Sequence, residues 1–386
     1  MSPVTSKSSE SPSNIRHERK PGVDLTLVNR LGLRELHLTM RPLPGERPAN
    51  LLWRLDALLR EHEAVVVRHE IFGSLDVYEE TINRLEKLSG DLFWPVTWTE
   101  GLACSGSLIA GMHVFAVSGA KVETLHLEGR IVGRIFNDGL AKHCLLGDIR
   151  PADLTASQPA QSGQVFENIE AALDRAGMRM TDLVQTWLHL DDILSWYGPF
   201  NVVRKEFFAK RNLFDHLVPA STGVGAKNPA GAAMVAGAWA MKPVDGRTIA
   251  REASSPLQCP APNYGSCFSR AVDIETPNHR RLLISGTASI DYDGNSTHDG
   301  DIKSQIERTM DVVEAILRSR DMNYTSVSRA TAYLKKLEHG SAVLEWCAAR
   351  GVSLPLLCLQ SAVCRDELLF ELELDAMIPL TPAAKS

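Results

Sequence analysis

The sequence of 386 residues contains 41 basic and 47 acidic side chains, for a formal net charge of −6. This mild acidity, without a long run of either sign, argues against nucleic acid or a membrane surface as a partner. Hydrophobic residues make up 44% of the chain, enough for the cores of two or three domains. No apolar run reaches the roughly 18 residues of a membrane span, and the seven cysteines include no C-x-x-C pair. We therefore expect a cytoplasmic protein with free thiols and predict no metal site.

Residues 1–23 are rich in Ser, Pro and charged side chains and contain no apolar core, which predicts a disordered leader. The next region, 24–119, begins with an extended segment. Its pattern then predicts helices at 50–60 and 77–88 and strands at 64–72, 95–101 and 110–118. The expected order is a hairpin, a helix, a strand, a second helix and two strands.

The same order of elements returns twice. The second region, 120–246, opens with extended pieces and is expected to contain helices at 164–178 and 196–211 and strands at 184–190, 219–225 and 231–241. The third region, 256–380, has predicted helices at 301–320 and 342–350 and predicted strands at 280–290, 328–334, 355–361 and 368–374. Residues 247–255, between the two regions, are expected to be a linker.

Internal repetition suggests how the regions pack. The segments 95–101, 219–225 and 355–361 each begin with Pro, and each is followed by a turn and a final apolar strand. Repeated units of this kind cover one another's exposed faces. The sequence therefore predicts an α+β fold of three like modules in one chain, packed as a pseudo-trimer. The first copy is the weakest, and an alternative is that residues 24–100 are only an N-terminal extension.

The C-terminal segment 355–375 combines strand periodicity with carboxylates. It is predicted to form two strands joined by the polar turn 365–367, and from Phe370 onward apolar and acidic residues alternate. In such a hairpin, Cys364 and Glu371 would share one side of the sheet. The alternative is that Glu371, Glu373 and Asp375 form a solvated face and that Cys364 is a small buried hydrophobe.

The order of elements resembles the RidA/YjgF superfamily, whose small α+β subunits form trimers with ligand clefts between subunits. Within it, the second and third regions look like the chorismatases of the 3-hydroxybenzoate synthase type. The matching stretches are VPASTGVG (218–225), NYGSCFSRA (263–271), SGTASI (285–290), HDGDIKSQ (298–305) and LQSAVCRDELLFELE (359–373).

The resemblance implies a lyase or hydrolase that acts on chorismate or a related carboxylated enol ether and releases pyruvate with a hydroxybenzoate or a dihydrodiol. It implies that Glu371 is the general acid and base and that Cys364 is its partner. The substrate-binding residues that it implies are Tyr264, Arg270, Gly286, Thr287, Ala288, Ser289, Gln360 and Arg365. Delivery of a proton to the enol-ether carbon suits a carboxylic acid whose pKa is raised by desolvation.

Two departures from the related families keep alternatives open. Chorismatases generally have arginines where this chain has Gln185 and Ser266-Cys267. RidA-type imine or enamine hydrolases have an arginine two residues after the proline of the fourth strand, where the three regions have Thr97, Ser221 and Leu357. The alternatives are an imine or enamine hydrolase of the RidA type and a small-molecule-binding protein without catalysis. In each case we expect a small-molecule ligand, no cofactor, and a monomeric pseudo-trimer or a low-order homo-oligomer.

Overall fold

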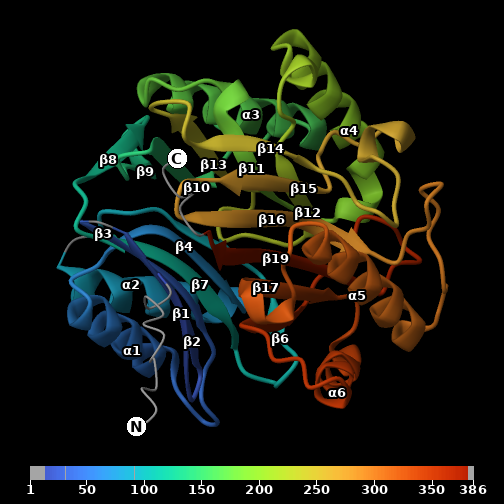
Figure 1. The fold of residues 1–386 in the computed structure, drawn as a ribbon, viewed down its shortest axis with the longest axis horizontal. Helices are drawn as coiled ribbons and strands as arrows, with labels where there is room; N and C mark the ends of the chain where they lie inside the picture. Colours follow the sequence, from blue (N-terminus) through green and yellow to red (C-terminus); the bar gives the residue numbers. More distant parts are fainter. Residues whose placement is uncertain (1–13, 31, 91, 381–386) are drawn as a thin grey trace, which may run out of the picture.

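The structure is a computed structural model that describes residues 14–30, 32–90 and 92–380. Three β-sheets occupy the interior, and each carries helices on its outer side (Figure 1). Each sheet falls almost wholly within one of the three regions, so the three-module α+β fold is confirmed and the first region is a full copy rather than an extension. None of the described helices is long and apolar enough to cross a membrane.

The first module is a six-stranded sheet in the order β1-β2-β3-β7-β4-β5. Its strands are β1 (Ile15–Lys20), β2 (Val23–Arg30), β3 (Leu33–Met40), β4 (Val65–Gly73), β5 (Val96–Thr99) and β7 (Ile109–Ser118). Its helices are α1 (Pro48–Glu61) and α2 (Tyr78–Ser89). The leucine stripe of α1 is buried against the sheet, as expected for an amphipathic helix.

The second module has the order β12-β11-β13-β10-β9-β8. Its strands are β8 (Val122–Leu127), β9 (Arg130–Asn137), β10 (Ala141–Ile149), β11 (Leu183–Leu190), β12 (Ala220–Gly225) and β13 (Met234–Pro243). Its helices are α3 (Gln158–Arg175) and α4 (Ile193–Lys210).

The third module has seven strands in the order β14-β15-β16-β19-β17-β18-β6. Its strands are β14 (Ile249–Ala253), β15 (Ala271–Glu275), β16 (His279–Ala288), β17 (Val327–Leu334), β18 (Leu356–Gln360) and β19 (Phe370–Pro379), joined by β6 (Leu102–Ala103) from the first region. Its helices are α5 (Ile302–Arg318) and α6 (Gly340–Ala349).

Three expectations about local structure were wrong. Part of the expected leader forms β1, which pairs with β2, whereas residues 1–13 lie outside the described residues. The expected linker contains β14, which pairs with β15. Strands β18 and β19 do not form a hairpin, because β17 lies between them and pairs with both.

The repeat extends to the register of the strands. Each central strand pair has a β-bulge at the same place, before Arg68, Gln185 and Arg329, respectively. Counting along the pairs from these bulges makes Gly111, Val235 and Glu371 equivalent positions. The three modules are thus copies in backbone geometry and differ in the side chains that they bring to equivalent places.

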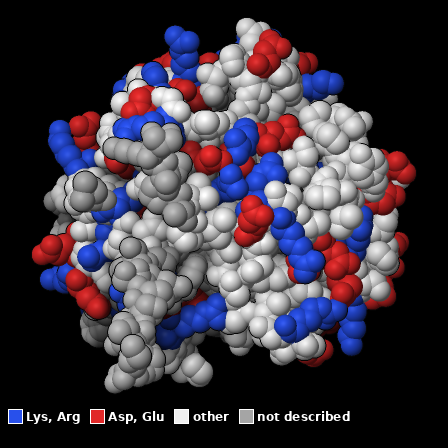
Figure 2. Space-filling model, in the orientation of Figure 1, with Lys and Arg blue, Asp and Glu red and all other residues white. Residues whose placement is uncertain are grey.

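The three sheets meet in a central core. Phe115 of the first module, Trp187 and Trp239 of the second and Leu283 of the third belong to one buried cluster, separate from the three cores between sheets and helices. On the face of the molecule shown in Figure 2, charged side chains of both signs are interspersed among other residues. Because the central cluster is apolar and contains residues of all three modules, the burial of its surface stabilises the packing of the modules against one another.

Candidate functional site

The carboxylates of β19 point into the junction between modules. Strand alternation places the apolar side chains of β19 in the helix-facing core of the third module. The opposite face carries Glu371, Glu373 and Asp375, which are 5%, 0% and 7% exposed. The alternative of a solvated acidic face was therefore wrong.

Glu371 lies at a close approach between two modules. On β19 it pairs with Ala288 of β16 on one side and with Tyr333 of β17 on the other. A Cβ at Gly286 would lie 2.0 Å from Oε1 of Glu371. The Gly286 N–H donates to Oγ1 of Thr222 on β12 of the second module at 3.0 Å. Glycine is needed at 286 because the carboxyl group occupies the space of a side chain.

Burial makes Glu371 a proton donor at neutral pH. Desolvation, together with the charge of Glu373, raises its pKa to about 8, and the charge of Arg270 opposes this shift. At pH 7 the group is mostly protonated, because this pKa lies above the ambient pH. A raised pKa in a carboxyl group is a common property of general acids.

Cys364 lies beside Glu371, although the expected hairpin is absent. Burial and the charge of Glu371 raise the pKa of the Cys364 thiol to about 12. Tyr197 of α4 hydrogen-bonds with Cys364, and burial raises the pKa of this tyrosine as well. At neutral pH the group is therefore a thiol and not a nucleophilic thiolate.

Two buried arginines complete the cluster. Arg270 is 2% exposed, and its Nε donates to the Cys259 carbonyl at 3.1 Å. Arg204 of α4 is also 2% exposed and donates to Asn201 Oδ1 at 2.7 Å. Among the described residues, neither forms an ion pair, and Nη2 of Arg270 and Nε of Arg204 have no hydrogen-bond partner.

Tyr264 and Arg365 border this cluster. The Arg270 and Arg365 guanidinium groups lie 5.3 and 5.6 Å from the centre of the Tyr264 ring. Arg365 also donates to the Gly294 carbonyl at 2.9 Å and to Ser296 Oγ at 3.1 Å. It thereby ties the loop before β19 to the loop after β16.

The other expected substrate-binding residues have different surroundings. Thr287 donates to the Ser285 carbonyl at 2.9 Å, and Ser289 Oγ lies 2.9 Å from Thr297 Oγ1. Ala288 packs in a small apolar cluster against which Cys364 lies. Gln360 lines a separate groove of about 460 Å³ with Lys335 and residues of all three modules. The structure thus brings Glu371, Cys364, Tyr264, Arg270 and Gly286 together, but it places Gln360 in another groove.

Sequence reasoning missed Tyr197 and did not place Arg204. The sequence of α4 contains a pattern that could have indicated the burial of Arg204. This residue falls at helical spacing within a stripe of otherwise apolar residues, namely Ile193, Trp196, Phe200 and Phe207. An arginine within an apolar stripe is unusual, because charged side chains are rarely fully buried without a partner. The buried Arg204 is therefore an exception to the apolar pattern of this helix face, and its guanidinium group lies 5.1 Å from the centre of the Phe200 ring.

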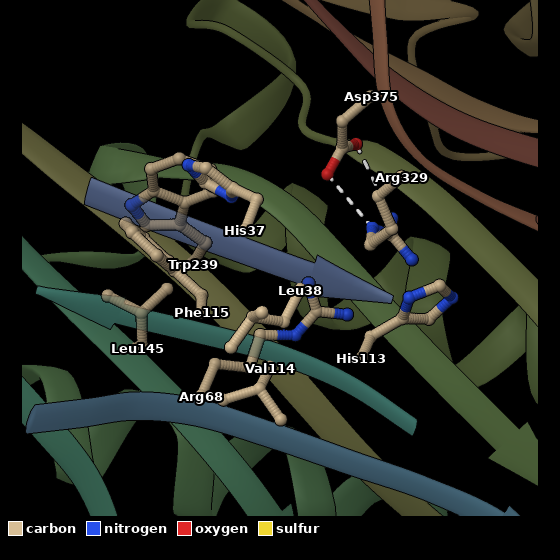
Figure 3. Close-up of a pocket in the computed structure, with 10 residues that line it drawn as sticks. All are labelled: His37, Leu38, Arg68, His113, Val114, Phe115, Leu145, Trp239, Arg329 and Asp375. Carbon is tan, nitrogen blue, oxygen red and sulfur yellow. Dashed lines mark hydrogen bonds and ion pairs between the residues drawn. The ribbon is translucent and has the colours of Figure 1, made fainter. Parts of the chain in front are cut away.

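A second polar cluster lies at the centre of the molecule (Figure 3). Arg68, His113, Arg329 and Asp375 gather at one end of a cavity of about 20 Å³, and aromatic side chains gather at the other. Arg329 forms ion pairs with Asp375 at 3.0 Å and with Glu373. The cavity has room for about one water molecule and is too small for a metabolite. Gln185 belongs to this network, since its amide donates to Asp375 at 3.2 Å.

Only one of the three equivalent positions in the modules carries a carboxyl group. Val235 stands at the position of Glu371 in the second module. In the first module the position is Gly111, where an added Cβ would lie 2.4 Å from Cδ2 of Leu357. An apolar side chain of the third module therefore fills that junction. Among these positions, the junction of the second and third modules is therefore the one that holds a buried carboxyl group with a raised pKa.

Comparison with known proteins identifies the fold. No protein-family model and no curated protein matches the chain. Among solved structures, a chorismatase crystal structure is 18% identical, with a TM-score of 0.61, and the match covers 81% of this chain and 92% of that one. A putative endoribonuclease L-PSP from Entamoeba histolytica is 20% identical and covers 34% of this chain and 100% of its own, with a TM-score of 0.29. The YjgF gene product from E. coli is 21% identical and covers 30% and 91%, with a TM-score of 0.26.

The molecule is thus a single-chain pseudo-trimer of α+β modules. More narrowly, its fold is similar to that of a chorismatase.

Proposed function

We propose that this protein is a chorismatase-like enzyme that cleaves a carboxylated enol ether, with chorismate as the first candidate substrate. The observation that carries the proposal is a neutral carboxyl group, Glu371, buried beside guanidinium groups that have no anionic partner. Such a site combines a proton donor with cations that attract a carboxylate substrate. The similarity of fold to a chorismatase supports the same reaction class.

In the proposed reaction, Glu371 transfers its proton to the methylene carbon of the enol ether. The electron pair of the C=C bond forms the new C–H bond, and the adjacent carbon becomes an oxocarbenium ion stabilised by the carboxylate left on Glu371. Attack by water, followed by cleavage of the ether C–O bond, releases pyruvate and a dihydrodiol, and the proton returns to Glu371. In an alternative route, the carboxylate of Glu371 takes a proton from a ring carbon, the ring C–O bond breaks as the oxocarbenium becomes the carbonyl group of pyruvate, and the aromatised ring leaves as a hydroxybenzoate without net consumption of water.

Cys364 acts in this scheme as a neutral group that shapes the site. Its thiol is hydrogen-bonded with Tyr197, and its raised pKa does not favour nucleophilic attack. Tyr264 and Arg270 are the proposed substrate contacts on the third module, with Gly286 leaving room for the acid. The imine or enamine hydrolase has less support, because Thr97, Ser221 and Leu357 stand where hydrolases of the RidA type have an arginine.

The test is incubation of the purified protein with chorismate, with pyruvate measured by a coupled assay and the aromatic product by mass. We expect pyruvate release by the wild type and a loss of at least about 100-fold in Glu371→Gln, since general acids contribute roughly 10²–10⁴-fold. The exposed Glu345→Gln on α6 is the matched control and should retain activity. A wild type that leaves chorismate intact would show that the substrate assignment is wrong.

A further inference from the structure

Three of the seven free cysteines converge where the first region meets the third module. Cys104 follows β6, the strand of the first region that joins the third sheet (Figure 1), and Cys358 lies within the neighbouring strand β18. Cys347 lies on α6. A negative charge on Cys104 or on Cys347 raises the pKa of Cys358, so both of these thiols lie near it.

The strand register places Cys104 directly opposite Cys358. Strands β6 and β18 are antiparallel, with Ala103 opposite Leu359, so the next pair along the strands is Cys104 and Cys358. The Cys104 N–H donates to the Cys358 carbonyl at 3.5 Å, and the pairing therefore continues to these two residues. Hydrogen-bonded partners in an antiparallel pair have Cα atoms about 5.5 Å apart and side chains on the same face. A disulfide bond requires a separation in this range.

Both thiols face the helix-covered side of the third sheet. Cys104 and Cys358 are partly exposed and pack against the hydrophobic core of the third module, which contains the apolar side chains of β19. A Cβ at Gly340, the first residue of α6, would lie 2.8 Å from Sγ of Cys104. Gly340 therefore leaves room for this thiol between β18 and α6. Glu371 lies on the opposite face of the sheet, so the two sites are separate.

We propose that Cys104 and Cys358 are a redox modification site, at which a small-molecule disulfide oxidises the pair to a reversible disulfide bond. The Cys104 thiolate attacks one sulfur of the small disulfide, which forms a mixed disulfide and releases one small thiolate. The Cys358 thiolate then attacks the Cys104 sulfur, forms the Cys104–Cys358 bond and releases the second small thiolate. Two protein thiols are oxidised, one small disulfide is reduced to two thiols, and the two protons pass from the protein thiols to the released thiolates.

Burial controls the rate of this exchange. It raises the pKa of the Cys104 thiol, and it raises the pKa of Cys358 to about 12. Since the thiolate is the attacking species, exchange should be slow at neutral pH and should accelerate about tenfold for each pH unit below the pKa.

The bond would fix the contact between the first region and the third module. Strand β6 joins the third sheet through only a short pairing with β18. A covalent link between Cys104 and Cys358 closes a long loop of the chain, and a disulfide stabilises mainly by restricting the unfolded state. Oxidation should therefore raise the midpoint of thermal unfolding by roughly 3 °C or more.

Disulfide mapping of the full chain tests the site. The protein is incubated at pH 8.5 with an excess of glutathione disulfide, the remaining thiols are blocked with N-ethylmaleimide, and tryptic peptides are analysed by mass without reduction. We expect one linked pair of peptides that contains Cys104 and Cys358. Its mass should be two hydrogen atoms below that of the two reduced peptides together, and the pair should disappear after treatment with dithiothreitol.

Two variants separate this pair from the third thiol. In Cys104→Ser, oxidation should no longer raise the midpoint of thermal unfolding. Cys347→Ser is the matched control and should keep both the Cys104–Cys358 link and the thermal shift. Circular dichroism of each reduced variant checks folding. A linked pair that contains Cys347, or folded wild type in which Cys104 and Cys358 stay unlinked when the reaction is complete, would overturn the proposal.

Discussion

Glu371 and Glu373 lie two residues apart on β19 and face the same way, yet they have different partners. Glu373 is held by an ion pair with Arg329 and accepts a hydrogen bond from Trp187 Nε1 at 2.7 Å. Glu371 instead lies against Gly286 and near Arg270 and Cys364. Since Glu373 is anchored as an anion, its charge helps to hold the proton on Glu371. One carboxylate thereby adjusts the acidity of the other.

Replacement of Glu373 tests this coupling. In Glu373→Gln the charge that raises the pKa of Glu371 is gone, so this pKa should fall below about 8. A general acid works in its protonated form, so activity is full below the pKa and declines as the pH rises through it. The alkaline limb of the kcat/KM profile should therefore move to lower pH.

The infrared C=O stretch of the protonated carboxyl, identified by comparison with Glu371→Gln, reports the same pKa without turnover. The control is Asp366→Asn, which removes an exposed carboxylate from the loop before β19. It should change neither the pKa of Glu371 nor the alkaline limb of the kcat/KM profile. An unchanged carboxyl titration in Glu373→Gln would contradict the coupling.

At the scale of elements, the bulge in β16 joins two modules at the candidate site. The Gly286 N–H faces Thr222 on β12, and the equivalent bulge in β10 presents the Asp148 N–H to Thr97 on β5 at 2.9 Å. The backbone contact is the same at both junctions. At the second junction Asp148 carries a side chain ion-paired with Arg150 at 2.7 Å, whereas Gly286 leaves that space to Glu371.

Gly286→Ala should disrupt this arrangement. The added Cβ would lie 2.0 Å from the Glu371 carboxyl oxygen. Either strand β16 or the Glu371 side chain must therefore move. We expect a stability loss of about 1–3 kcal/mol, as for overpacked sites, measured by urea denaturation, together with lower activity. Gly223→Ala on β12 is the matched control, because its Cβ would meet no atom within 4 Å. Equal effects of the two substitutions would show that the close approach is unimportant.

At the scale of the whole molecule, a buried ion network follows the pseudo-threefold axis. The bulges bring Arg68, Gln185 and Arg329 to equivalent places, and Arg329 forms ion pairs with Glu373 and Asp375 of its own module. The nearby charge of Arg329 lowers the pKa of Asp375 against the opposing effect of burial. Gln185 and Trp187 of the second module donate hydrogen bonds to Asp375 and Glu373, so the network links these two modules and also holds the carboxylate whose charge raises the pKa of Glu371.

Arg329→Met should destabilise the molecule strongly. Removal of one partner of a buried ion pair leaves uncompensated charge and costs about 3–5 kcal/mol. Arg251 is 45% exposed, and its buried partner Asp273 would keep the ion pair with Arg320 at 2.9 Å, so Arg251→Met should cost at most about 1 kcal/mol. Chemical denaturation at pH 7 measures both. A loss in Arg329→Met no larger than that in Arg251→Met would mean that the network is not needed for stability.

The sequence by itself determined the module order, the three-copy architecture and the position of the acidic strand, because these depend on local periodicity and repetition along the chain. Residues 15–20 and 249–253 escaped prediction as strands, because β1 and β14 are edge strands with many exposed side chains and weak apolar patterning.

Only the tertiary structure decided that the carboxylates of β19 are buried, that β17 separates β18 from β19, and that Arg204 and Tyr197 of α4 reach Glu371. The burial of the carboxylates and the approach of α4 depend on which faces of separate modules pack together, whereas the place of β17 depends on strand pairing within the third module. The packing of modules involves contacts between residues that are distant in the sequence, such as Gly286 with Thr222, 64 positions apart, and Gln185 with Asp375, 190 positions apart, which no local pattern encodes. Burial between modules also sets the pKa of Glu371, and so the chemistry of the site exists only in the assembled pseudo-trimer.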